Sequence, residues 1–188
     1  MTDATAWLLV IPRVPAQPSR HRVAVWRELR RTGAVPVAAG TWTLPDLPAF
    51  TDRLATVREL AERGGGSLAV LAAAAHGDGD LAVLVEAFAA ARRDEWGELV
   101  AECDRFEAEI AKEIAKEKFT FGELEEEEQG FERLRRWHRD LVRRDVLGLP
   151  EAAVATTRLD EVGQDLAGYA ELVFAAQLPG AADGPERG

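Results

Sequence analysis

The chain has 188 residues with a formal net charge of −10, and 47% of its residues are hydrophobic. That length predicts one or two compact domains with a sizeable core, and the apolar content excludes a chain that is disordered throughout. A single cysteine excludes an intramolecular disulfide framework or a cysteine-rich zinc module, and three scattered histidines give no pattern for a metal site.

Nothing in the sequence indicates export or a membrane span. No apolar run reaches the ~18–20 residues that cross a bilayer, and the N-terminus lacks the basic and apolar regions of a signal peptide. We therefore expect a cytoplasmic protein without a membrane partner, and no cofactor. The acidic total also argues against a protein that coats nucleic acid.

The first part of the chain alternates short apolar runs with amphipathic segments. Residues 6–11 form a continuous apolar run of the kind that builds a buried strand. Residues 19–32 lie between a proline and a glycine and predict a helix. On it Val23, Trp26 and Leu29 recur at helical spacing, so we expect Trp26 and Leu29 to face the sheet. The remaining elements expected here are strands at 34–38 and 41–44, a helix with apolar positions 50, 54, 57 and 60, and a strand at 68–75.

This order predicts an α+β fold over residues 1–77. Strand-helix-strand-strand-helix-strand gives a ferredoxin-like unit, a four-stranded antiparallel sheet with both helices on one face. The other face then needs a cover, which is either the rest of the chain or a partner such as the second copy of a homodimer.

The rest of the chain is predicted to be helical. One long segment carries apolar residues at steps of four and three, which makes a single apolar face on a helix. These residues are Leu99, Cys103, Phe106, Ile110 and Ile114. Two further helices are expected at residues 123–145 and 159–173, and short connections favour an antiparallel helical bundle over residues 78–178. Residues 179–188 are rich in glycine, proline and aspartate, and they predict a disordered tail.

Charge is spread unevenly along the chain. Residues 1–78 carry nine arginines against seven carboxylates, a net of +2, whereas residues 79–188 carry 14 basic and 26 acidic side chains, a net of −12. The segment from Arg13 to Arg31 holds six arginines and one carboxylate, Glu28. Such an asymmetry suggests that the two parts of the chain have different functions.

Arginines around the helix at residues 19–32 are the candidate binding residues. Steps of seven and four bring Arg20, Arg27 and Arg31 into one stripe, and Arg13 and Arg22 extend it near the helix start. A guanidinium group donates two parallel hydrogen bonds to an oxyanion, so the stripe suits DNA phosphates or a small tetrahedral oxyanion. The alternative is that these arginines pair with carboxylates of the acidic part of the chain.

The other polar residues predict no catalytic or metal-binding set. The five glutamates between 123 and 128 begin a helix, where their charge favours the helix dipole, and we expect them to be solvated. His138 lies near an apolar face and predicts a partly buried, hydrogen-bonded histidine, while Cys103 predicts a small buried hydrophobe. Arg144 and Asp145 end the same helix without an assigned role.

Several short motifs occur together, in a fixed order and spacing. They are Trp7-Leu8-Leu9, Val25-Trp26-Arg27-x-Leu29 leading into Gly33-Ala34-Val35, Trp42-x-Leu44-Pro45, Lys118-Phe119-Thr120 with Glu123-Leu124, and Arg143-Arg144-Asp145-x-x-Gly148. From about residue 6 to 176, the chain thereby resembles the N-terminal domain of the chromate-resistance regulators called ChrB. Its first part also resembles the sheet domain shared by PaaX-type repressors and CRISPR adaptation nucleases.

The resemblance implies a transcriptional regulator of a chromate-efflux operon, released by chromate, and hence a binding protein and not an enzyme. It assigns no ligand residues in this region, and longer members carry a further domain after it. Two other functions stay open: an adaptor that binds proteins but not DNA, and a metal-dependent nuclease. A nuclease of that kind needs a carboxylate at the end of the first strand, where this chain has Ile11-Pro12-Arg13.

Overall fold

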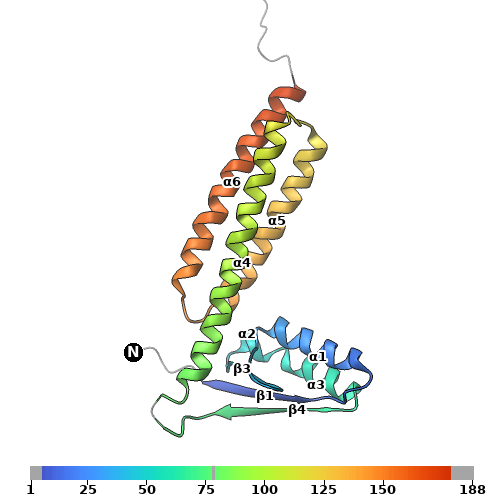
Figure 1. The fold of residues 1–188 in the computed structure, drawn as a ribbon, viewed down its shortest axis with the longest axis vertical. Coiled ribbons are helices and arrows are strands. Elements are labelled where there is room, and N and C mark those ends of the chain that lie inside the picture. Colours follow the sequence, from blue (N-terminus) through green and yellow to red (C-terminus); the bar gives the residue numbers. More distant parts are fainter. Residues whose placement is uncertain (1–5, 78, 179–188) are drawn as a thin grey trace, which may run out of the picture. The chain divides into compact units, whose positions relative to one another are not determined.

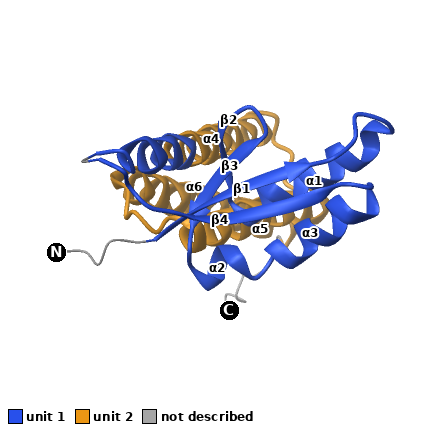
Figure 2. Cartoon of the chain, turned by 90° about the horizontal axis from the view of Figure 1, so that it is seen from below, with its two compact units in different colours: residues 1–92 blue, residues 93–188 orange. Residues whose placement is uncertain are grey.

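A computed structural model describes residues 6–77 and 79–178 (Figure 1). Its strands are β1 (Trp7–Arg13), β2 (Val35–Ala38), β3 (Thr41–Pro45) and β4 (Ser67–Ala73). Its helices are α1 (Ser19–Thr32), α2 (Pro48–Thr51), α3 (Leu54–Arg63), α4 (Ala82–Ala115), α5 (Phe121–Arg144) and α6 (Pro150–Gln177). Two compact units, residues 1–92 and 93–188, are coloured separately in Figure 2. The tail predicted at 179–188 lies outside the described residues.

The four strands form one antiparallel sheet in the order β2-β3-β1-β4, which confirms the predicted α+β class. Helix α1 carries the chain from the central strand β1 to the edge strand β2, and α2 with α3 carries it from β3 to the other edge, β4. Figure 1 shows these three helices together on one side of β1 and β4.

Side chains alternate across β1, as the two-residue period of a strand requires. Leu8 and Val10 are buried, whereas Leu9 and Ile11 on the opposite face are half-buried. Completely buried side chains from the sheet and the helices make the core of this unit, and each contributes roughly 1.5–3 kcal/mol through burial when it is as large as valine or leucine. They include Val10, Leu29, Leu44, Phe50 and Val57.

The predicted second helix is two helices in the structure. Helix α2 begins at Pro48, and α3 begins six residues later at Leu54. Phe50 is completely buried, and Val57 and Ala61 form the inner face of α3 at a spacing of four residues. The apolar pattern continues across the break in the backbone, so periodicity alone does not reveal the break.

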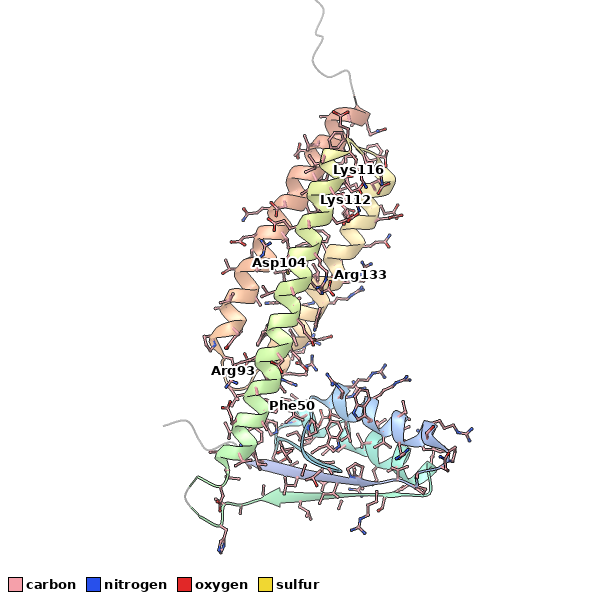
Figure 3. All side chains as sticks on the ribbon, viewed as in Figure 1. Phe50, Arg93, Asp104, Lys112, Lys116 and Arg133 are labelled. Carbon is pink, nitrogen blue, oxygen red and sulfur yellow. The ribbon has the colours of Figure 1, made fainter. Side chains whose placement is uncertain are left out.

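An aromatic cluster joins the start of α4 to the sheet unit. The ring of Phe88 lies 5.4 Å from that of Trp7 and 5.7 Å from that of Phe50, which is labelled in Figure 3, both in edge-on geometry. The two units consequently divide inside α4, between Arg92 and Arg93, whereas the predicted division was at residue 77.

Helices α4, α5 and α6 pack around a second core of their own. Its members include Leu99, Leu134 and Tyr169, one from each helix, and Cys103, which is completely buried as predicted. Burial raises the pKa of the Cys103 thiol. Ile114, predicted to extend the apolar face of α4, is 36% exposed. Over the described ranges, no helix has both the length and the apolar character that crossing a membrane requires.

Asp145 holds the turn between α5 and α6. Its carboxylate accepts hydrogen bonds from the backbone N–H groups of Gly148, at 3.1 Å, and Leu149, at 3.2 Å. The indole Nε1–H of Trp96, which is only 1% exposed, donates to the same carboxylate at 3.2 Å. A buried tryptophan needs such a partner for its N–H group. Asp145 thereby ties α4 to the turn between the other two helices.

Asp145→Ala is expected to lower the free energy of unfolding by about 2 kcal/mol, because several hydrogen bonds to a charged group are lost and a buried N–H group is left without its acceptor. Urea unfolding followed by circular dichroism measures the change. Asp140→Ala is the matched control: Asp140 is 62% exposed, and its carboxylate pairs with the exposed Arg143, so a change within about 0.5 kcal/mol is expected. Equal effects of the two substitutions would contradict the role of Asp145.

Candidate functional site

Helix α1 turns one face toward the sheet and the opposite face toward solvent. Val25, Leu29 and Thr32 are buried, at the spacing of four and three residues that marks one side of a helix. Every charged side chain on the exposed side is an arginine. These are Arg20, Arg22, Arg27, Arg30 and Arg31.

Glu28 is the single carboxylate of α1, and it points inward. It is 6% exposed, and its Oε1 accepts hydrogen bonds from Nε and Nη2 of Arg53, at 2.9 and 2.7 Å. Its Oε2 lies 3.8 Å from Nη1 of Arg31. A buried carboxylate is tolerated only when it is paired in this way. Because Arg53 directly precedes α3, the ion pair connects the middle of α1 to the start of α3 and leaves no negative charge on the exposed face.

Four of the predicted binding arginines have no carboxylate partner inside the sheet unit. Within residues 6–77 and 79–92, no ion pair involves the following side chains: Arg13, Arg20, Arg22 and Arg27. Arg20 donates from Nε to the ring nitrogen Nε2 of His21 at 3.4 Å, which is not a carboxylate contact. Arg31 keeps a 73% exposed side chain despite its contact with the buried carboxylate. In this unit, the guanidinium groups therefore still have donors for an external anion.

A glycine turn contacts both the end of β1, at Arg13, and the first turn of α1, at His21. A Cβ atom on Gly66 would lie 1.9 Å from the carbonyl oxygen of Arg13, and one on Gly64 would lie 2.8 Å from Cβ of His21. Only residues without a side chain allow both approaches. The turn between α3 and β4 thus packs against the end of β1 and against α1 at once. Because side chains alternate along β1, Arg13 shares the face of Leu9 and Ile11 and not that of Val10, so this packing does not place its exposed guanidinium group beside the arginines of α1.

The orientation predicted for Trp26 is wrong. Trp26 is 49% exposed and Val23 is 42% exposed, while Leu29 is completely buried. Successive steps of three residues rotate by about 60° around an α-helix, so these three side chains drift across its surface and cannot share one buried face. Sequence reasoning missed Trp26 as a surface residue, although a signal was present: Arg22 and Arg30 lie four residues to either side of it, on the same helix face.

The acidic run at the start of α5 is mostly exposed, as predicted. Lys118 contacts Glu123 at 3.1 Å, and the glutamates at 125, 126 and 128 are exposed. Glu127 differs, because it is half-buried and its pKa is raised by burial and by neighbouring carboxylates, Glu109 foremost. Among the residues that the structure describes, no three histidine, cysteine or acidic side chains are grouped to hold a metal ion.

His138 has the environment that the sequence predicts. It is half-buried beside Trp96, and its Nε2 lies 2.8 Å from Oγ1 of Thr156. Burial lowers its pKa, against the opposing effect of Asp160. Arg144, for which the sequence suggested no role, lies 3.5 Å from Glu95 in the second unit. These contacts are those of residues that stabilise the helices.

Comparisons with known proteins give one family. Residues 22–179 match the family model described as "Protein ChrB, N-terminal". A curated relative, "Protein ChrB" of Cupriavidus metallidurans, is 32% identical over 74 residues. This match covers 39% of the present chain and 23% of the relative, so the aligned part spans less than a quarter of that protein.

Arg53→Ala is expected to destabilise the sheet unit by about 2 kcal/mol, since the buried Glu28 carboxylate loses two charge-assisted hydrogen bonds and keeps only the 3.8 Å contact with Arg31. Urea denaturation provides the measurement. Arg63→Ala, which removes an exposed arginine at the end of α3, is the control and should change stability little. A loss no larger than that of the control would rule out the anchoring role of the ion pair.

The lowered pKa of His138 predicts a pH-dependent stability. Because the folded protein binds the His138 proton less readily than the unfolded chain does, this side chain costs stability as the pH falls through the usual histidine pKa of about 6.5. The difference in unfolding free energy between wild type and His138→Gln should therefore shift in favour of the variant between pH 8 and pH 5. Parallel stability profiles of the two proteins would contradict this expectation.

Proposed function

Because the chain belongs to the family of ChrB N-terminal domains, we propose that it is a regulator associated with chromate resistance and that it binds DNA with the exposed face of α1. One observation carries the DNA-binding part of the proposal: this face holds five arginines and no carboxylate. Arginine suits phosphate because its planar group donates paired hydrogen bonds and stays charged at every physiological pH. In this proposal the protein acts by binding DNA and not by catalysis.

The spacing of the arginines favours an extended anion over a small one. Arg20 and Arg31 are separated by eleven residues, or about 16 Å along an α-helix. One tetrahedral oxyanion cannot contact both ends of such a row. A DNA duplex carries phosphates over that whole distance, at about one charge for every 1.7 Å of its axis. The spacing therefore supports DNA over a single bound oxyanion.

The charge of the whole chain limits how DNA would approach. Residues 79–188 carry a net charge of −12, which repels the phosphate backbone, whereas α1 and the residues before it are locally basic. This asymmetry supports docking of one face and disfavours coating of the nucleic acid. Release by chromate, which the family relation suggests, is part of the proposal and is tested on the assembled complex by adding chromate with sulfate as the control anion.

Replacing Arg27 and Arg31 together by alanine is expected to weaken binding to the DNA upstream of the protein's own gene. Each lost phosphate contact should also reduce the slope of log K against log salt by about 0.9, hence by about 1.8 for the pair. Gel shifts over a series of salt concentrations measure both effects.

The control for charge is the double variant Arg63→Ala with Arg143→Ala. It removes the same number of positive charges from exposed positions outside α1. It should bind DNA with nearly the wild-type affinity and slope. Absence of a shift with the wild-type protein at low salt would contradict DNA binding, and equal weakening by both double variants would contradict the assignment to α1.

A further inference from the structure

Trp26 is exposed in a way that the packing of its unit does not require. Its side chain is 49% exposed, whereas Trp7, Trp42 and Trp96 are at most 8% exposed, and the remaining tryptophan, Trp137, is half-buried. A single exposed apolar side chain needs no explanation, but the exposed Val23, one helical turn away, extends the apolar surface of Trp26, and such a continuous surface is a candidate binding surface.

The arginines of α1 lie on both sides of Trp26. At about 100° per residue, Trp26, Arg30 and Val23 occupy the centre of the exposed arc, within about 60° of one another. Arg22 lies on one side of this strip, and the other three exposed arginines lie on the opposite side. The guanidinium carbon of Arg30 is 5.4 Å from the centre of the Trp26 ring, a cation–π contact that orients the indole.

A shallow apolar hollow lies beside the Trp26 ring. Its volume is about 150 Å³, and it is lined by Pro12, Val14, Arg22, Val25, Trp26, Leu29 and Trp42. All but Arg22 among these side chains are apolar or aromatic. The hollow has room for a methyl group next to the indole, but it offers few hydrogen-bonding partners for a charged ligand.

This arrangement matches a helix in the major groove of DNA. Such a helix has phosphates along both flanks and base edges opposite its centre. In the major groove the 5-methyl group of thymine is the apolar feature that a base presents. An indole and a valine side chain are suited to contact it, while the flanking arginines are suited to contact the two backbones.

We propose that Trp26 is a specificity-determining residue that contacts thymine methyl groups in the major groove. This inference rests on the proposed DNA binding by α1, and it assigns different roles in that binding to Trp26 and to the arginines. Trp26 selects thymine-containing sites, and Arg22, Arg27 and the other flanking arginines supply affinity that does not depend on sequence. Stacking of Trp26 on unpaired bases is the competing outcome.

Uracil-substituted DNA tests the proposal directly. The duplex upstream of the protein's own gene is prepared once with thymine and once with uracil, which removes each 5-methyl group and keeps the hydrogen-bonding edges of the bases. The full chain should bind the thymine duplex more tightly, by about fourfold for each methyl contact. Trp26→Ala should reduce this preference by at least that factor while keeping the wild-type salt slope.

Arg27→Ala is the matched control on the same helix face. It should weaken binding to both duplexes equally, lower the salt slope by about 0.9, and leave the thymine preference unchanged. Unfolding midpoints equal to that of the wild type show that both variants are folded, as their exposed positions allow.

Four results would overturn the inference. Equal wild-type binding to both duplexes, or an unchanged thymine preference in Trp26→Ala, would refute the methyl contact while DNA binding stands. Tighter binding to the single strand than to the duplex, lost in Trp26→Ala, would assign Trp26 to base stacking instead. No binding of wild type to any of these DNAs would refute the proposed function together with this inference.

Discussion

The ion pair between Glu28 and Arg53 fixes how α1 lies on the sheet. A carboxylate that is only 6% exposed must keep its partner, and its partner directly precedes α3, so α1 cannot rotate about its axis without breaking the pair. In this orientation of α1, Val25 and Leu29, which precede and follow Glu28 in the sequence, are buried as well. One buried charge thus sets which side chains of α1 face the solvent.

The charged side chains of the two units differ in how they are paired. In the second unit, oppositely charged side chains pair on the helix surfaces: Arg158 contacts Asp104, labelled in Figure 3, as well as Glu107 and Glu161. In the sheet unit, the negative charge of α1 is buried, and most arginines of α1 have no carboxylate partner among the described residues of that unit. The net charge of −10 is therefore a poor guide to the surface of α1, because it sums two parts with opposite signs.

Much of the fold is predictable because its elements have strong local signals. Helix α1 spans residues 19–32 as predicted, since a proline and a glycine bound it, and the sheet is four-stranded and antiparallel, as the alternation of strands and helices predicts. The break between α2 and α3 is not predictable from periodicity, because the apolar spacing continues across it. The packing of Phe88 on Trp7 and Phe50 joins residues far apart in sequence, and local patterns contain no information on such contacts.

For the candidate site, the sequence by itself determined that arginines gather on one helix, because the spacing of residues on an α-helix follows from backbone geometry. It also determined the α+β class and the motifs that place the chain in its family. Only the tertiary structure decided that Glu28 turns inward and that Trp26 turns outward. The physical reason is that the rotation of a helix is set by its partners in space, here Arg53 and the sheet, and sequence spacing within α1 does not specify them.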